Sequence, residues 1–246
     1  MLAFATFATF LLAAPALAAP LAPSGPPITP GGPAKLISPS TNCRTNCSLA
    51  NATIALPTNQ TVLTATTTAM KFAGLGVGTQ NYTCNSTSLT YISSGAVAEL
   101  FDVSCLVSQP SFASLQDTAF TMWTASPAPE TPAALITKLG TSPTVLGQHY
   151  FVANPSGAAG TSPKWDFTSN VDAGNTNAFV IGAKTGDLPA PTGASDVDWL
   201  QLKNVEGDLA TTVYRTDTRG GQPPASCTAG SPAIEVKYVA KYFLFK

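Results

Sequence analysis

Hydrophobic and polar residues alternate along several short runs of the chain, a pattern typical of strands that bury one face of a sheet. The clearest run is 234–245, where Ile, Val, Tyr, Ala, Tyr and Leu fill every second position and charged residues stand between them at the start. We expect this strand to be half polar where it begins and buried on both faces where it ends. Similar runs rich in Val, Phe, Tyr and Thr lie at 97–107, 149–153, 164–169, 178–185, 197–205 and 209–218.

Turn residues separate these runs, and only two segments, 111–123 and 132–140, have the periodicity of short helices. Strands that follow one another without long helices between them favour antiparallel pairing over βαβ units. The pattern therefore predicts an all-β fold, an antiparallel β-sandwich or barrel with one or two short helices.

A glycine-rich stretch, GLGVGTQNYTC at 74–84, has some likeness to a nucleotide-binding loop. A dinucleotide site needs G-x-G-x-x-G between a strand and a helix, but here the third glycine, Gly78, comes one position early. The residues that follow are strand and turn formers, and Gln80, Tyr82 and Cys84 alternate. We predict a strand whose glycines permit a bulge or the close approach of another backbone, and no nucleotide cofactor.

The two ends of the chain differ in composition. Residues 1–19 form an apolar run in which Ala16 to Ala18 fit the cleavage pattern of a secretory signal peptide. Residues 20–42 are dense in proline and glycine and indicate a flexible lead-in, and residues 43–246 suit a single all-β domain. No later run is apolar enough to span a membrane, so we expect a soluble protein secreted to the extracellular space or the cell wall.

Charge and cysteine content narrow the classes of partner. Charged residues make up 10% of the 246 residues and the formal net charge is -1, with lysines and arginines scattered along the chain. This distribution offers no basic surface to a phosphate backbone, so nucleic acid is not an expected partner. The chain has one histidine and no second Cys/His pair at ligand spacing, so no metal site is predicted. Five cysteines in a secreted chain predict two disulfides and one cysteine left over: Cys43, Cys47, Cys84, Cys105 and Cys227.

Five N-x-S/T triplets lie in the first part of the predicted domain, at Asn46, Asn51, Asn59, Asn81 and Asn85. They predict N-linked glycans if the chain passes through a eukaryotic secretory pathway. Asn81 is the triplet that burial would keep bare, because it belongs to the strand that contains Tyr82 and Cys84. The C-terminal half carries no triplet and is expected to be the uncovered side.

His149, the single histidine, lies near the start of a predicted strand. An enzyme could use it as a general base oriented by Asp166 or Asp102. The sequence offers no nucleophile motif beside it, and a lone histidine is more often a buried imidazole bonded to the backbone. We favour the buried imidazole and keep the pair of His149 and Asp166 as the alternative.

Arg215, Asp217 and Arg219 occupy alternate positions of a predicted strand, which would place their side chains on one face. Two guanidiniums around a carboxylate could bind an anionic ligand or a sugar through paired hydrogen bonds. The same three side chains could instead satisfy one another as an ion ladder on a solvent face, and we favour that interpretation.

The tryptophans are candidates for a surface on which a sugar ring could stack. Trp199 lies in the alternating segment DWLQL and is expected in the core. Trp165 stands between Lys164 and Asp166 and is expected to be the exposed one. Trp165 is therefore the candidate contact for a carbohydrate ligand.

Six segments taken together resemble one protein family: GVGTQNYTC, GAVAELFDVSC, LGQHYF, VDWLQL, VYRTDTRGGQPPASC and VKYVAKYFLF. In this order they are similar to an uncharacterised family of secreted fungal and bacterial proteins, a domain of unknown function whose fungal members are often labelled malate dehydrogenase. The resemblance covers about residues 55–246. The recurrent features of the family fall on Gly78, Gln80, Tyr82, Cys84, Leu100, Gly147, His149, Tyr150, Trp165, Trp199, Leu200, Arg215, Thr218, Gly220, Gly221, Pro224, Cys227, Tyr238 and Tyr242.

The resemblance also bears on the disulfides and on the label. Cys84 and Cys227 lie in its two strongest motifs and are expected to pair, which leaves Cys105 to join Cys43 or Cys47. A malate dehydrogenase would need a nucleotide-binding βαβ half, for which this sequence carries no signal. We therefore expect neither that activity nor a cofactor.

The function expected from the sequence is that of a secreted, glycosylated, extracellular or cell-wall-associated binding or structural module. Carbohydrate or a small anion is the candidate ligand. The alternative is a small-molecule enzyme that uses His149 with Asp166.

Overall fold

The computed structural model describes residues 47–126 and 145–246. Contacts divide the chain into two units, Met1–Ser38 and Pro39–Lys246, and every described residue lies in the second. The predicted signal peptide and lead-in, the predicted helix at 132–140, Cys43 and Asn46 lie outside the described residues.

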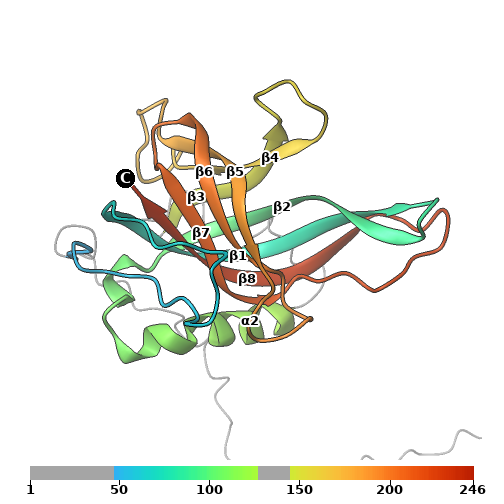
Figure 1. Cartoon of the computed structure of the whole chain (residues 1–246), viewed down its shortest axis with the longest axis horizontal. Coiled ribbons are helices and arrows are strands. Elements are labelled where there is room, and N and C mark those ends of the chain that lie inside the picture. Colours follow the sequence, from blue (N-terminus) through green and yellow to red (C-terminus); the bar gives the residue numbers. More distant parts are fainter. Residues whose placement is uncertain (1–46, 127–144) are drawn as a thin grey trace, which may run out of the picture. The chain divides into compact units, whose positions relative to one another are not determined.

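Antiparallel strands in the described residues close into a barrel in sequence order, and β8 returns to pair with β1 (Figure 1). The strands are β1 Met70–Asn85, β2 Thr90–Asp102, β3 Val145–Ala153, β4 Thr161–Asp166, β5 Phe179–Leu188, β6 Trp199–Gly207, β7 Thr212–Gly220 and β8 Ile234–Phe245. The all-β prediction is confirmed, and the barrel is the correct one of the two architectures that the sequence left open.

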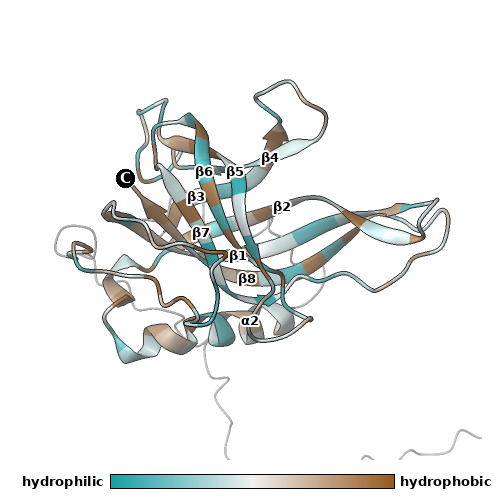
Figure 2. Ribbon diagram, viewed as in Figure 1, coloured by the Kyte–Doolittle hydropathy of each residue, from teal (hydrophilic) through white to brown (hydrophobic). Residues whose placement is uncertain are grey.

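Two apolar clusters lie on the two sides of the barrel wall. On β8, Tyr238, Ala240, Tyr242 and Leu244 belong to the inner cluster, and Val239, Phe243 and Phe245 belong to the outer one, as the alternation predicted. The last residues of β8 are buried on both faces and its first residues are not, which is also as predicted. Figure 2 shows the same alternation of hydrophobic and hydrophilic positions along the strand ribbons.

The glycine-rich stretch lies within β1 and allows the close approach that its sequence predicted. A Cβ atom on Gly76 would lie 2.5 Å from the ring of Tyr242, and one on Gly78 would lie 2.0 Å from the backbone oxygen of Val97. A register shift follows between Asn81 and Tyr82. Because glycine has no side chain, the tyrosine rings of β8 can pack close to the backbone of β1 inside the barrel.

One helix in the described part of the chain covers the outer face of the barrel below β8 (Figure 1). Two short 3-10 turns, η1 Ser104–Leu106 and η2 Pro110–Ser114, lead into α2, Leu115–Ala125, which confirms the helix predicted at 111–123. Trp123 anchors α2, because its Nε1 donates a hydrogen bond to the Gly78 carbonyl oxygen at 2.7 Å. The Lys237 ammonium lies over the same indole, 4.5 Å from the ring centroid.

The β1–β2 hairpin continues beyond the barrel as an arm, and the segment before β8 runs beside it (Figure 1). The Cys84–Cys227 disulfide joins the two, which confirms the expected pairing. A second disulfide, Cys47–Cys105, joins the N-terminal segment to η1 and decides between the two partners considered for Cys105. Each disulfide therefore joins two parts of the domain that are distant in sequence, Cys227 to Cys84 of β1 and Cys47 to Cys105 of η1.

Candidate functional site

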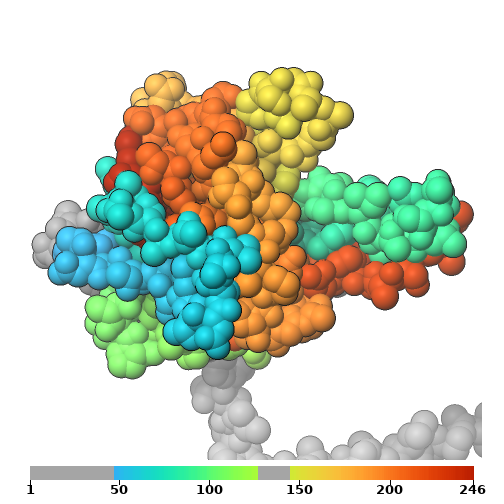
Figure 3. Space-filling model, in the orientation of Figure 1, coloured from blue at the N-terminus to red at the C-terminus, as the bar shows by residue number. Residues whose placement is uncertain are grey.

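A pocket of about 510 Å³ lies at one end of the barrel. Its lining residues come from the middle and carboxyl-terminal parts of β1, β3, β5 and β7, from the amino-terminal parts of β2, β4 and β6, and from residues that adjoin these strands, which meet at one end of an antiparallel barrel. In Figure 3 the projecting arm and the β3–β4 connection stand on either side of a hollow in the surface. The lining includes Gln80, Tyr82, Ser93, Phe151, Pro163, Lys184, Asp187, Asp198, Leu200, Leu202, Arg215 and Gln222.

Arg215 is the cation at the inner end of this pocket. Its strand position pairs with Leu200 of β6 and with Tyr242 of β8, so the side chain points into the barrel with Tyr242. The guanidinium donates from Nε and Nη2 to the Asp198 carbonyl oxygen, at 3.0 and 2.8 Å. No carboxylate of the described residues forms an ion pair with it.

Two further polar side chains of β1 enter the barrel beside Arg215. The Tyr82 hydroxyl donates to the Gly221 carbonyl oxygen at 2.8 Å. Gln80 is only 6% exposed, and its Nε2 forms no hydrogen bond of good geometry, although it lies near enough to the Tyr238 hydroxyl to affect the pKa of that phenol. A buried amide without such a bond is costly, so this donor is a group that a ligand could satisfy.

A smaller cavity of about 30 Å³ continues the pocket inward, past Arg215, to His149, Trp165 and Tyr242. The hydroxyls of Tyr238 and Tyr242 lie 2.9 Å apart within hydrogen-bond distance. Burial raises the pKa of the Tyr242 phenol, and the nearby Arg215 guanidinium partly opposes that rise. The interior of the barrel is thus polar around Arg215 and apolar elsewhere.

Charged side chains also stand at the rim of the pocket. The Lys184 ammonium pairs with the Asp187 carboxylate. Burial, followed by the charge of Asp187 and a hydrogen bond between the two carboxyl groups, raises the pKa of Asp198. Lys184 and Asp187 neutralise each other, which leaves Arg215 as the cation of the pocket that lacks an ion-pair partner among the described residues.

Residues 64–246 match the model of DUF3455, a family described as a protein of unknown function. The chain belongs to this family. Comparison with curated proteins and with solved structures found no significant match. The DUF3455 description names no activity, and the match gives the malate dehydrogenase label no support.

Several of the positions that carried the family resemblance lie at the pocket and its inner cavity. They line these spaces or contact a lining residue: Gln80, Tyr82, His149, Trp165, Leu200, Arg215, Gly221, Tyr238 and Tyr242. Of these, only His149, Trp165 and Arg215 were site candidates from the sequence. The signal for the others was the period of two, which places Gln80 and Tyr82 on one face of β1 and Tyr238 and Tyr242 on one face of β8.

The pair of His149 and Asp166, the alternative considered from the sequence, is not formed. His149 pairs with Trp165 across β3 and β4, whereas Asp166 pairs with Gln148, so the two side chains project from opposite faces of the wall. On the outer face, Asp166 Oδ2 accepts a hydrogen bond from the Tyr150 hydroxyl at 2.6 Å and forms an ion pair with Lys164 at 2.8 Å. Burial opposes ionisation there, but hydrogen bonds from Lys164, Thr168 and Tyr150 outweigh it and lower the pKa of Asp166 to about 2.

His149 itself is a buried imidazole, 2% exposed, with Nδ1 2.9 Å from the Lys164 carbonyl oxygen. This is the arrangement favoured from the sequence. Asp102, the other candidate orienter, accepts a hydrogen bond from the Ser104 backbone N–H. His149 thus lies at the inner end of the pocket with its ring nitrogen bonded to the backbone.

The expectation that Arg215, Asp217 and Arg219 share one face is also wrong. The register of β7 and β8 shifts between Thr216 and Arg219, and Asp217 has a φ of 48°, so the strand bulges there. Arg215 points into the barrel, whereas Asp217 pairs with Lys241 at 3.4 Å on the outer side. The bulge therefore separates the three side chains instead of aligning them.

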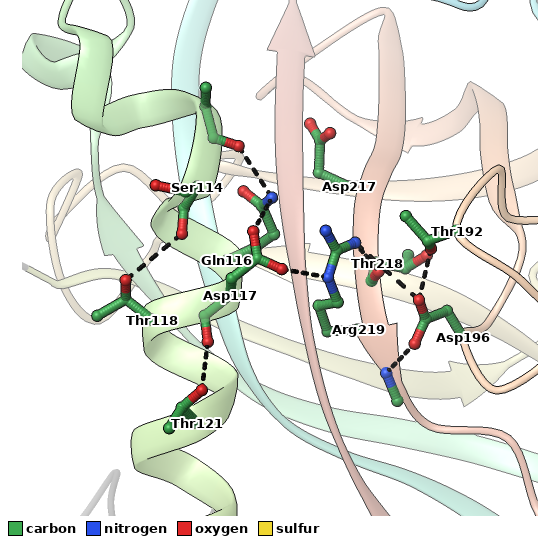
Figure 4. A network of polar contacts seen from close by, with 12 residues as sticks. Ser114, Gln116, Asp117, Thr118, Thr121, Thr192, Asp196, Asp217, Thr218 and Arg219 are labelled. Carbon is green, nitrogen blue, oxygen red and sulfur yellow. Dashed lines mark hydrogen bonds and ion pairs between the residues drawn. The ribbon is translucent and has the colours of Figure 1, made fainter.

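Arg219 belongs to a structural network on the outer face (Figure 4). Its guanidinium binds the Asp117 carboxylate of α2 and lies 4.0 Å from the Asp196 carboxylate. Asp196 in turn accepts hydrogen bonds from the Thr192 hydroxyl and the Gly220 backbone N–H. This network fastens α2 and the loop before β6 to the end of β7.

Trp165 is 1% exposed, so the prediction of an exposed, sugar-stacking Trp165 is wrong. Its polar neighbours in sequence, Lys164 and Asp166, lie on the outer face, while the indole lies inside against His149. Trp199 is 6% exposed and belongs to the core, as predicted.

Two of the predicted glycosylation triplets, at Asn51 and Asn59, have exposed asparagines, whereas Asn81 and Asn85 are partly buried. Asn85 Oδ1 accepts backbone hydrogen bonds from Thr87 and Ser88 in the hairpin turn. Within 47–126 and 145–246, no cluster of three or more His, Cys, Asp or Glu side chains is arranged to hold a metal ion. No helix in these ranges has the length and apolar character needed to cross a membrane.

Proposed function

We propose that the chain is a secreted, glycosylated binding protein of the extracellular space or the cell wall, and that it takes a small polar ligand into the pocket at the end of its barrel. The observation that carries this proposal is the inner end of the pocket, which the Arg215 guanidinium and the buried Gln80 amide both line. Among the described residues Arg215 has no ion-pair partner, and Gln80 Nε2 forms no hydrogen bond of good geometry. A closed barrel of eight strands is wide enough to hold one small ligand. Ligand sites are concave, mostly apolar and supplied with a few convergent polar groups.

Three features support the extracellular part of the proposal. The first residues have the pattern of a signal peptide. Disulfides such as Cys84–Cys227 and Cys47–Cys105 form and persist in oxidising compartments. Asn51 and Asn59 present accessible side chains for N-linked glycans.

The enzyme alternative loses its stated basis, because His149 and Asp166 lie on opposite faces of the barrel wall. His149 contacts an indole, a backbone oxygen and the inner cavity. A binding site needs no base at this position, so the pocket fits binding better than general-base catalysis.

Amide NMR of the secreted chain against a library of small sugars, acids and neutral fragments tests the binding proposal. Hits should shift the amides of Ser93, Lys184 and Gln222, which line the pocket. Leu200→Trp should fill the pocket and abolish these shifts, whereas Val205→Trp, at an exposed position of the same strand, should leave them unchanged. The proposal is refuted if no fragment shifts the pocket amides, or if every hit survives Leu200→Trp.

Expression of the full chain in a eukaryotic secretory host tests the extracellular part. The protein should appear in the medium without its first residues, and N-glycosidase treatment should reduce its mass. Asn51→Gln with Asn59→Gln should remove part of that mass difference, because these are the exposed triplets of the described residues. An unprocessed chain retained in the cell would contradict this part of the proposal and leave the binding part standing.

A further inference from the structure

The donors at the inner end of the pocket have the chemistry of an anion site. A guanidinium carries five N–H donors, and Arg215 uses two of its nitrogens on one backbone oxygen, that of Asp198. Asp187 pairs with Lys184, and no carboxylate of the described residues lies within ion-pair distance of Arg215. The Asp198 carboxyl is near enough for the charge of Arg215 to oppose the rise in its pKa. The positive charge of Arg215 is therefore not neutralised by a direct ion pair in the described part of the barrel.

Gln80 provides an independent indication. Its side chain is more than nine-tenths buried and lines the same pocket. Its Nε2 lies close enough to the Tyr238 hydroxyl to oppose the rise in the pKa of that phenol, but it forms no hydrogen bond of good geometry. Hydrogen-bond donors are rarely left unpaired when they are buried. An acceptor group placed between Arg215 and Gln80 would satisfy both side chains at once.

Apolar side chains form part of the pocket wall, and polar or charged ones form the rest. Phe151 and Pro163 line one part, and Leu200 and Leu202 line another. The volume of about 510 Å³ lies within the range of small-molecule sites. A ligand that fits has a charged acceptor at one end and a compact apolar body at the other.

We propose that the pocket binds a small monocarboxylate with an apolar body, its carboxylate on Arg215 and Gln80 and its body between Phe151 and Leu200. The planar guanidinium matches a carboxylate through paired hydrogen bonds, and a single unpaired cation matches a single negative charge. This inference rests on the proposed function, because it names the ligand class of that same pocket.

Calorimetric titration of the secreted chain with benzoate and hexanoate, and with the isosteric neutral amides benzamide and hexanamide, tests the ligand class. Each carboxylate should bind at least about tenfold more tightly than its amide, because a hydrogen bond to a charged group is the stronger one. In the unsubstituted chain, benzoate should also shift the side-chain NH2 resonances of Gln80.

Variants locate the site. Arg215→Gln should weaken benzoate binding by about tenfold or more, and Gln80→Leu should weaken it less, because it removes a neutral donor. Arg219→Gln is the matched control, since this arginine lies on the same strand but binds Asp117 on the outer face. If Arg215→Gln fails to fold, Arg215→Lys takes its place in the test. Lysine keeps the charge but lacks the planar guanidinium, so this variant should bind benzoate more weakly than the unsubstituted chain without losing binding altogether.

The outcomes separate the two proposals. The monocarboxylate class would be overturned if benzoate and benzamide shift the pocket's backbone resonances with equal affinity. It would also be overturned if benzoate still binds both Arg215 variants as tightly as it binds the unsubstituted chain. In either case the proposal of a ligand pocket would stand. Benzoate binding that shifts only amides outside the pocket would overturn it as well. If no compound of any class shifts the pocket amides, the proposed function itself fails.

Discussion

The imidazole of His149 lies almost flat against the indole of Trp165, with ring centroids 4.6 Å apart and 14° between the ring planes. Both side chains lie inside the barrel, and Nδ1 of His149 is within hydrogen-bond distance of the Lys164 carbonyl oxygen. Burial lowers the pKa of His149 to about 4, a hydrogen bond to the Lys164 carbonyl oxygen partly opposes this, and the charge of Arg215 adds to the lowering. The only histidine of the chain is therefore neutral at pH 7 and is held as part of the barrel interior.

Heteronuclear NMR of the His149 ring nitrogens should show a neutral imidazole from pH 8 down to about pH 5. The unfolded state takes up a proton near pH 6.5 and the folded state only near pH 4. The unfolded state thus binds more protons between these values, and stability is lost as the pH falls from 6.5 towards 4, by up to about 3 kcal/mol. An imidazole that titrates near pH 6.5 in the folded chain would contradict this prediction.

Glu99→Gln should stabilise the protein at pH 8 and have little effect at pH 4. Glu99 is fully buried, and its one hydrogen bond comes from Gln148 Nε2 at 3.4 Å, so burial raises the pKa to about 7. The folded state holds the proton between pH 4.5 and 7 and the unfolded state does not, so stability falls as the pH rises through this window, by up to about 3 kcal/mol.

Urea unfolding of the Glu99→Gln variant at several pH values measures this effect. Glu206→Gln is the control, because Glu206 is exposed on β6. The same pH dependence in Glu99→Gln as in the unsubstituted chain would show that another group is responsible.

Gly78→Ala should destabilise the barrel by about 1–3 kcal/mol or prevent folding, because overpacking of a close backbone contact forces strands apart. The added Cβ would lie 2.0 Å from the Val97 backbone oxygen and 2.7 Å from the Ala98 Cβ. Gly74→Ala, on the same face of β1, would have its closest contact with Leu146 Cδ1 at 3.3 Å and should cost less. Thermal unfolding of both variants tests the prediction, which requires that Gly78→Ala has the lower melting temperature.

Peptide mapping without reduction should recover the pairs Cys84–Cys227 and Cys47–Cys105. Replacing Cys84 and Cys227 together by serine should lower the free energy of unfolding by about 2–5 kcal/mol, because the disulfide limits the unfolded chain. The double variant avoids an unpaired thiol that could exchange. Recovery of Cys43 in either pair would contradict the connectivity.

The bond between Arg219 and Asp117 should contribute less than about 1 kcal/mol, because the Asp117 side chain is 46% exposed and solvent screens the pair. A double-mutant cycle of Arg219→Gln and Asp117→Asn measures the coupling free energy. A coupling well above that value would mean that the network with Asp196 acts as one unit.

The strands and the helix at 111–123 could be predicted because their signals are local. The alternation along 234–245 and the lack of a helix after Gly78 depend on neighbouring residues alone. The prediction of an exposed Trp165 fails because exposure of its charged neighbours, Lys164 and Asp166, says nothing of the residue between them. Adjacent residues of a strand face opposite sides of the sheet.

The site could not be assembled from sequence because it depends on register and on a bulge. The pairing of His149 with Trp165, rather than with Asp166, follows from how β3 and β4 align, which spacing does not give. The positive φ of Asp217 interrupts the alternation of β7, and no glycine marks that position in the sequence. Gln80 was not a candidate because a single polar residue on an inner face has no motif.

The arm formed by the β1–β2 hairpin has a bearing on how the molecules behave at high concentration. Beyond Tyr82 the outer edge of β1 no longer pairs with β8, and a free edge strand is a template for pairing with another chain. The backbone N–H of Cys227 donates to the Leu89 carbonyl oxygen at 2.8 Å, and the Cys84–Cys227 disulfide holds that segment against the arm. The disulfide should therefore also limit aggregation through this strand edge. Its reduction should increase self-association under conditions in which the barrel is still folded.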